Sequence, residues 1–193
     1  MGPGRVGDFL QIFRTGVGVA VRAGCSLKDL LCGQFQLDES YVDRRITTIF
    51  LDGKPVDAVG SARIREGSTL ALSAAMPGLA GAILRRGSAL APLRANLSRE
   101  DGEKSEGPER DGVITVKLFN LLAPELAPGF LSRGVLLPAA EAEAFFRQRP
   151  PAFWDDCREI LLDGKRVEAA LLQGGRWVAP GEPVDLSVVL REA

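Results

Sequence analysis

The sequence predicts an α+β fold made of two tandem copies of one small domain. The chain has 193 residues, a length that fits one or two domains. Its two halves contain similar segments in the same order, and a charged stretch without aliphatic side chains separates them. Glycine and proline, at 22 and 12 residues, are frequent enough to favour turns over long helices.

The repeated segment is the clearest feature of the sequence. Residues 49–58 and 160–169 read IFLDGKPVDA and ILLDGKRVEA, and seven of the ten positions are identical. The Asp–Gly pair in each is typical of a tight turn. Residues 66–73 and 180–187 are also similar, after an insertion of three residues. An ordered set of similarities indicates a duplicated domain, because a solenoid needs three or more short repeats.

Each copy is expected to contain two strands, a helix and two further strands. In the first copy, Ser26 and Asp29 have the spacing of a capping box, and Leu27, Leu30 and Leu31 follow on one helical face. The first two strands are expected to form a hairpin. The expected elements of this copy are strands at 8–14, 17–21, 46–51 and 69–73, and a helix that begins at Ser26.

The second copy is expected to repeat this order. Its helix is predicted at 139–149, because acidic residues lie near the start, basic residues lie near the end, and Pro150 and Pro151 stop it. The expected strands lie at 113–119, 134–137, 159–162 and 184–190, the first two forming a hairpin with a longer connection.

Residues 98–112, SREDGEKSEGPERDG, separate the two copies. They contain six acidic and three basic residues, for a net charge of −3, and no Val, Ile, Leu or Phe. Such a stretch cannot bury apolar surface, and it is typical of a flexible linker. An acidic binding tail is the alternative. We therefore expect a first domain at 1–97, with an extension at 76–97, an acidic linker at 98–112 and a second domain at 113–193.

The strand–helix–strand order and the repeated segment resemble the ubiquitin-like β-grasp superfamily. The sulfur-carrier proteins of thiamine and molybdopterin synthesis are similar in the helix start at 26–31, the strand and turn at 49–56 and the segment at 65–72. The resemblance covers residues 8–75 and, more weakly, 113–190. It implies two tandem β-grasp domains, each with a mixed sheet and one main helix. The DGK segment also resembles RNA-binding S4 modules.

The composition argues against several common enzyme mechanisms. The chain has no histidine, which excludes Ser–His and Cys–His nucleophile pairs and imidazole metal ligands. Its three cysteines lack the spacing of a metal site, and no GxxxxGK[ST] phosphate loop is present. The net charge is −1, whereas nucleic-acid binders usually carry an excess of basic residues. We therefore expect a protein that is not an enzyme, with no catalytic residue, no metal site and no cofactor.

The sulfur-carrier resemblance implies a free C-terminal Gly–Gly that is activated and thiocarboxylated. This chain ends in Leu190-Arg-Glu-Ala193, and the pair Gly174–Gly175 precedes the expected last strand. A carrier function would therefore require processing after the first copy, near Gly78 or Gly81.

Residues 76–94, MPGLAGAILRRGSALAPLR, have no counterpart in the second copy. Residues 67–84 carry no charge and are near the minimum length of a membrane span, but Pro77 and the nearby glycines oppose one. One interpretation is a docking segment for a partner; the alternative, which we favour, is a short helix packed against the other domain. The candidate partner-binding residues are Met76, Pro77, Gly78, Leu79, Gly81, Ile83, Arg85 and Arg86.

Together these features favour a non-catalytic binding or adaptor protein. We expect a protein partner, or a second copy of the chain, since a domain of about 80 residues has a marginal core. We expect neither a nucleic acid nor a membrane as partner, and the absence of a signal peptide favours the cytoplasm. The alternatives are a divergent sulfur-carrier-like protein and an S4-like RNA-binding protein.

Overall fold

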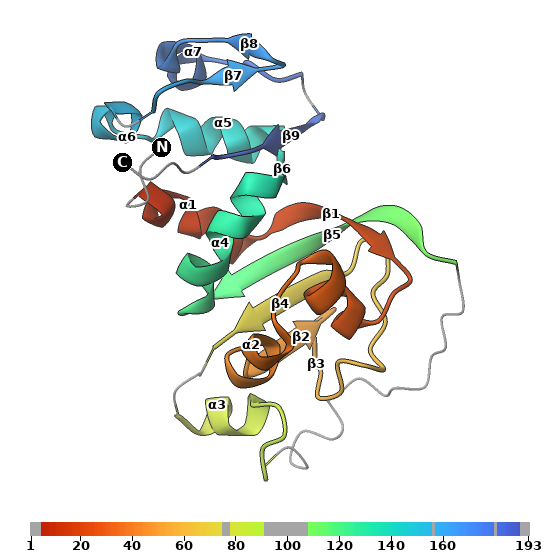
Figure 1. Cartoon of the computed structure of the whole chain (residues 1–193). Coiled ribbons are helices and arrows are strands. Elements are labelled where there is room, and N and C mark those ends of the chain that lie inside the picture. The colour runs from red at the N-terminus through yellow and green to blue at the C-terminus, as the bar shows by residue number, and fades with distance from the viewer. Residues whose placement is uncertain (1–4, 75–77, 91–107, 156, 180, 190–193) are drawn as a thin grey trace. The chain divides into compact units, whose positions relative to one another are not determined.

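The computed structural model describes residues 5–74, 78–90, 108–155, 157–179 and 181–189 (Figure 1). They form an α+β structure with a mixed sheet and several helices, which confirms the α+β class and the mixed sheet of the predicted fold. The contacts divide the chain into two compact units. Residues 12–126 form the first, called here the sheet unit; residues 1–11 and 127–193 form the second, called the aromatic unit.

The sheet unit is built on strands in the order β3-β2-β4-β5-β1. The parallel pair β4 and β5 lies in the centre. The remaining neighbouring pairs of this unit, β3 with β2, β2 with β4 and β5 with β1, are antiparallel. The strands are β1 (Val17–Ala23), β2 (Thr48–Leu51), β3 (Lys54–Pro55), β4 (Thr69–Ser73) and β5 (Arg110–Phe119). The strand predicted at 69–73 is confirmed, and those predicted at 17–21, 46–51 and 113–119 are confirmed with small changes in their ends.

The central strand β5 comes from the second half of the sequence. Val17 pairs with Val116 on the β1 side, and Leu70 pairs with Val116 on the β4 side. Alternate side chains of β5 point into the core, where Ile114 and Leu118 are no more than 1% exposed. The predicted hairpin between 113–119 and 134–137 is therefore wrong. Helix α4 (Leu122–Arg133) fills the connection, and β5 pairs with β1 and β4 instead.

The segment at 8–14 is helical, so the predicted first strand is also wrong. It belongs to α1 (Val6–Thr15), in which Val6, Phe9, Ile12 and Phe13 are buried. Spacings of three and four residues place these side chains on one helical face, whereas a strand would need alternation. Gly16, with φ +120°, then turns the chain into β1.

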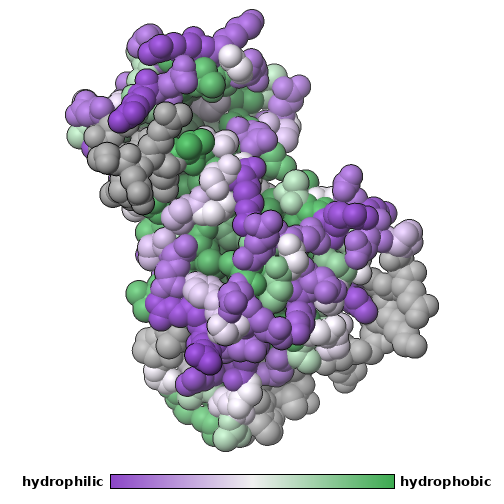
Figure 2. Space-filling view, viewed as in Figure 1, coloured by the Kyte–Doolittle hydropathy of each residue, from purple (hydrophilic) through white to green (hydrophobic). Residues whose placement is uncertain are grey.

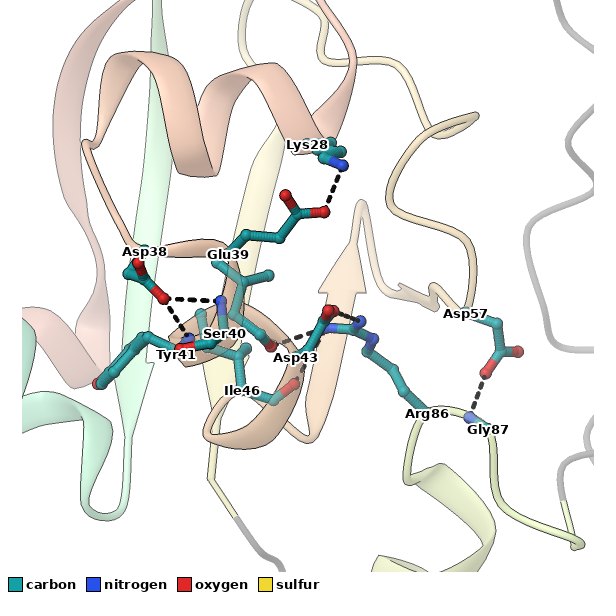
Figure 3. Close-up of polar contacts among 11 residues, drawn as sticks. Lys28, Asp38, Glu39, Ser40, Tyr41, Asp43, Ile46, Asp57, Arg86 and Gly87 are labelled. Carbon is teal, nitrogen blue, oxygen red and sulfur yellow. Dashed lines mark hydrogen bonds and ion pairs between the residues drawn. The ribbon is translucent and has the colours of Figure 1, made fainter.

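The helical region after β1 follows the prediction closely. The Ser26 hydroxyl accepts a hydrogen bond from the Asp29 N–H at 3.0 Å and donates one to the Asp29 carboxylate at 2.6 Å. Leu27, Leu30 and Leu31 are fully buried. The chain forms a wide helical turn, η2 (Asp29–Gln34), and then α2 (Glu39–Arg44). The Asp38 carboxylate caps α2 by accepting from the Ser40 N–H at 2.8 Å (Figure 3).

Both repeated Asp–Gly pairs form the same turn. Asp52 and Gly53 have φ values of 53° and 78°, and Asp163 and Gly164 have values of 50° and 75°. Two consecutive residues with positive φ are the signature of a type I′ hairpin turn. The sequence repeat is therefore also a structural repeat at this point, which confirms the predicted turns.

The second half continues into the aromatic unit. The predicted helix at 139–149 is confirmed as α5, and the later strands are shorter than expected. β6 pairs antiparallel with β9, and β7 pairs antiparallel with β8. The elements after α4 are β6 (Val135–Pro138), α5 (Ala139–Arg147), α6 (Pro151–Asp155), β7 (Leu161–Leu162), β8 (Lys165–Arg166), α7 (Ala169–Gly174) and β9 (Pro183–Leu186).

Aromatic side chains form the core of this unit. The Phe9 ring centroid lies 5.3 Å from that of Phe145 and 5.6 Å from that of Phe153. The Arg149 guanidinium lies 4.3 Å from the Phe145 ring centroid and donates a hydrogen bond to the Asp8 carbonyl at 3.2 Å. A cation over an aromatic face is attracted by the ring quadrupole. The N-terminal residues therefore belong to the same core as the helices of the second half.

The two units do not coincide with the two halves of the sequence. The sheet unit takes β5 and the first part of α4 from the second half, and the aromatic unit takes residues up to 11 from the first. This division differs from the expected boundaries at 97 and 113. Within the expected linker at 98–112, residues 98–107 lie outside the described residues, and 110–112 begin β5.

Candidate partner-binding site

The candidate segment is helical where the structure describes it. Met76 and Pro77 lie outside the described residues. Gly78, Leu79, Gly81 and Ile83 belong to α3 (Gly78–Leu84), and Arg85 and Arg86 follow its end (Figure 1). The structure therefore keeps six of the eight predicted residues together, in one short helix and the two residues that follow it.

Side chains of this segment differ sharply in exposure. Leu79 is 69% exposed, whereas Ile83 is half-buried and Gly81 is buried. Figure 2 shows a small hydrophobic area over α3, next to hydrophilic surface of the sheet unit. One side of α3 thus packs on the unit, and the other presents an apolar side chain to solvent.

Arg86 fixes the end of this segment to the sheet unit (Figure 3). Its Nη1 donates hydrogen bonds to the carbonyl oxygens of Val42 and Ile46, both at 3.2 Å. Its Nη2 forms an ion pair with the Asp43 carboxylate at 3.3 Å, and its backbone N–H donates to the Thr47 carbonyl at 2.8 Å. The last carbonyls of a helix lack intrahelical partners, and a cation near them is favourable. At the end of α2, Arg86 supplies hydrogen-bond donors for the carbonyl groups and a positive charge.

The next residue adds a second attachment. The Gly87 N–H donates to the Asp57 carboxylate at 3.4 Å, and Gly87 has a φ of +61° (Figure 3). The segment after α3 is therefore held against the loop that follows β3 as well as against α2. Because the Arg86 side chain is only 15% exposed, its charge faces protein rather than an external anion.

A second polar cluster joins α2 to α4 within the sheet unit. The Tyr41 hydroxyl donates a hydrogen bond to Glu125 Oε2 at 2.6 Å. The Arg45 Nε donates to both Glu125 oxygens at 3.0 Å, and its Nη2 makes a further short contact with Oε1. Sequence reasoning missed this cluster, because Glu125 lies 80 or more residues from its partners and no local pattern links them.

The pKa shifts of Tyr41 and Glu125 indicate that this cluster has a structural role. Burial and the hydrogen bond to Glu125 raise the pKa of Tyr41, so its hydroxyl stays a donor. The hydrogen bonds from Arg45 lower the pKa of Glu125, so its carboxylate stays an acceptor. Neither group is poised to exchange a proton near neutral pH.

Two of the three cysteines have a raised pKa, and the described carboxylates and cysteines form no metal-binding group. Burial raises the pKa of both Cys25 and Cys32, which disfavours the reactive thiolate. No group of three Cys, Asp or Glu side chains in the described part of the chain could hold a metal ion. In the same part, every helix is too short or too polar to cross a membrane.

Comparison with known proteins adds no relative. No protein-family model, no curated protein and no solved structure matches this chain.

Proposed function

We propose that this is a non-catalytic binding or adaptor protein and that its partner is another protein. The observation that carries the proposal is α3, which presents Leu79 at 69% exposure from a segment anchored by Arg86. Binding usually costs free energy because side chains and loops at the interface lose conformational entropy. This loss is smaller when the apolar side chain stands on a helix that is already held in place. The partner surface is therefore expected to hold an apolar pocket for Leu79.

The sheet edge at β3 is less suited to a partner strand. β3 has only two residues, and one of them is Pro55, which has no N–H to donate. Strand addition at this edge would therefore form few backbone hydrogen bonds. This favours docking through the α3 side chains over extension of the sheet at β3.

The strand order supports a β-grasp-like interpretation of the sheet unit. In the fold implied by the resemblance, the first and last strands lie parallel at the centre of the sheet, and a helix follows the second strand. The parallel pair β4 and β5, flanked by antiparallel β2 and β1, has this arrangement. Here β5 would take the place of the first strand although it comes later in the chain. In the aromatic unit, the described strands form no parallel pair, so the interpretation is weaker there.

A sulfur-carrier role has less support. A carrier would need an extended tail that ends near Gly78 or Gly81, but both glycines lie within α3. Intact mass spectrometry of the protein from its native host distinguishes the two functions, because only a carrier predicts a product that ends at one of these glycines.

An RNA-binding role also has less support. Arg86 makes contacts inside the sheet unit, which leaves its charge poorly placed for a phosphate. Retention of RNA that falls steeply with salt would favour this role, whereas no retention at low salt would exclude it.

The adaptor proposal is tested by site-specific photo-crosslinking in the native host. A photoreactive residue at position 79 is compared with one at position 161, because Leu161 is similarly exposed, at 57%, but lies in β7. We expect a discrete protein adduct from position 79 only. Leu79→Glu should then reduce recovery of that protein at least tenfold, and Leu161→Glu should not. Equal adducts from both positions, or none from position 79, would contradict the proposal.

A further inference from the structure

The strand β5 occupies an inner position of the sheet unit, between β1 and β4, and this strand position is called here the slot. β5 lies between β1 and β4, and these two strands do not pair with each other. Residues 110–116 pair with β1, and residues 115–119 pair with β4. Without β5, both strands would present unpaired backbone groups in the middle of the sheet. Unpaired edges of this kind readily accept a strand from another chain.

The slot is specific for β5 in its side chains and at its ends. Ile114, Val116 and Leu118 fill the core and are no more than 1% exposed. At one end of the strand, Arg110 forms an ion pair with Glu66 at 3.4 Å. At the other end, the Asn120 side-chain amide donates to the Ser73 hydroxyl at 3.0 Å. An apolar strand with these two ends therefore matches the slot in burial, register and polar contacts.

The same division of the chain recurs in the aromatic unit. There the N-terminal helix contributes Phe9, whose ring packs in tilted orientations against Phe145 and Phe153 of the second half. Residues up to 90 and residues from 108 onward are thus two complementary pieces, and each unit needs both. Exchange of the second piece between two copies would preserve every contact within the units, which is the condition for domain swapping.

The length of the connection permits a closed single chain. Phe119 pairs with Ser73, and β5 begins nine residues before Phe119, so Arg110 lies roughly 30 Å from the Ser73 end of the sheet. Arg86 holds the segment after α3 near that same end, next to the start of β2. The 19 residues between Leu90 and Arg110 reach at most about 65 Å, which is enough to return to the start of β5.

We propose that the slot between β1 and β4 binds β5 as a separable strand, and that a second copy of the chain supplies it in a strand-exchanged dimer. This inference is independent of the adaptor function, because the slot and α3 are different surfaces. The length of the connection between Leu90 and Arg110 sets the balance between the closed monomer and the dimer.

The test shortens the connection. Deletion of residues 91–107 leaves six residues between Arg86 and Arg110, with a reach of about 23 Å, which is too short to span the roughly 30 Å to the start of β5. The matched control replaces the same 17 residues by a Gly/Ser sequence of equal length. We expect light scattering to show twice the molecular mass for the deletion variant and a mainly monomeric control. A folded, monomeric deletion variant would overturn the proposal.

If the deletion variant does not fold, a protein cleaved within the connection tests whether the slot binds β5 as a separable strand. A protease site replaces residues 100–105 of the full chain, and the protein is cleaved after folding. We expect the two fragments to elute together with unchanged circular dichroism. Val116→Lys should separate them, and Lys117→Gln, on the other face of β5, should not. Fragments that separate without any substitution would overturn the proposal.

Discussion

Arg86 shows how one side chain connects a surface segment to the interior of the sheet unit. Its guanidinium binds two main-chain carbonyls and one carboxylate around the end of α2. The sequence marked residues 76–94 as unusual because they lack a repeat partner. It could not distinguish Arg86 from its neighbour Arg85, since the acceptors are backbone groups 40 or more residues away. Only the folded chain separates an anchoring residue from exposed residues such as Leu79.

Removal of this anchor should destabilise the protein. Arg86→Ala leaves the carbonyls of Val42 and Ile46 without their donors, and we expect a loss of roughly 1–3 kcal/mol in the free energy of unfolding. Arg44→Ala removes the same charge from an exposed position in α2 and should change stability by less than about 0.5 kcal/mol. Urea denaturation of both variants measures the difference; equal effects would show that Arg86 does not anchor the segment.

The cluster of Tyr41, Arg45 and Glu125 should make stability depend on pH. The folded-state pKa of Glu125 is lowered, so its contribution is present above the pKa of the unfolded chain and is lost as the pH falls through the folded value. The pKa of Tyr41 is raised, so its contribution is present below about pH 10 and is lost at higher pH.

Two variants test this dependence by urea denaturation. Glu125→Gln should reduce stability more at pH 7 than at pH 3, because the wild-type contribution is lost as the pH falls through the lowered folded-state pKa of Glu125. Tyr41→Phe, which lacks only the hydroxyl, should cost about 1 kcal/mol at pH 7. A Glu125→Gln effect of the same size at both pH values would contradict the assigned ion pair.

At the scale of elements, the sequence predicts best where local rules decide. The Asp–Gly turns, the Ser26 helix start and the strand at 69–73 depend on neighbouring residues, and the structure confirms them. The strand predicted at 8–14, as one arm of a hairpin with 17–21, is wrong. The spacing of Phe9, Ile12 and Phe13 instead fits the observed helix. Strand pairing is set by distant residues, so the position of β5 could not be read from local patterns.

Two glycines in and after α1 test the helical assignment. Gly7 has open space around its Cα, and alanine there should stabilise the helix by about 0.5 kcal/mol. Gly16 has a φ of +120°, and a Cβ there would lie 2.7 Å from the Thr115 Cγ2. Gly16→Ala should therefore cost roughly 2 kcal/mol through backbone strain and overpacking. Thermal denaturation compares the two variants. A destabilising Gly7→Ala would argue against α1.

At the scale of the whole molecule, each unit combines segments from both halves of the duplicated sequence. The repeat correctly indicates similar local elements, including the two type I′ turns. It also suggests two independent domains, whereas the described contacts place β5 in the sheet unit and residues before 12 in the aromatic unit. A repeat in the sequence shows which segments are similar to each other. It does not show to which folded unit each segment belongs.

This arrangement predicts that the expected first domain does not fold by itself. A fragment of residues 1–97 lacks β5, so β1 and β4 have no common partner. It should show little amide dispersion by NMR and no cooperative unfolding. A fragment of residues 1–126 contains the whole sheet unit and should show both. Cooperative unfolding of the shorter fragment would mean that β5 is dispensable.

The central claim is that a strand from the second half completes the sheet of the first. Backbone nuclear Overhauser effects in the full-length protein test it most directly. The structure predicts signals between β5 and both of its neighbours, for example from Thr115 to Gly18 and from Val116 to Leu70. Signals that instead connect residues 113–119 to residues 134–137, as in the hairpin expected from the sequence alone, would contradict the account.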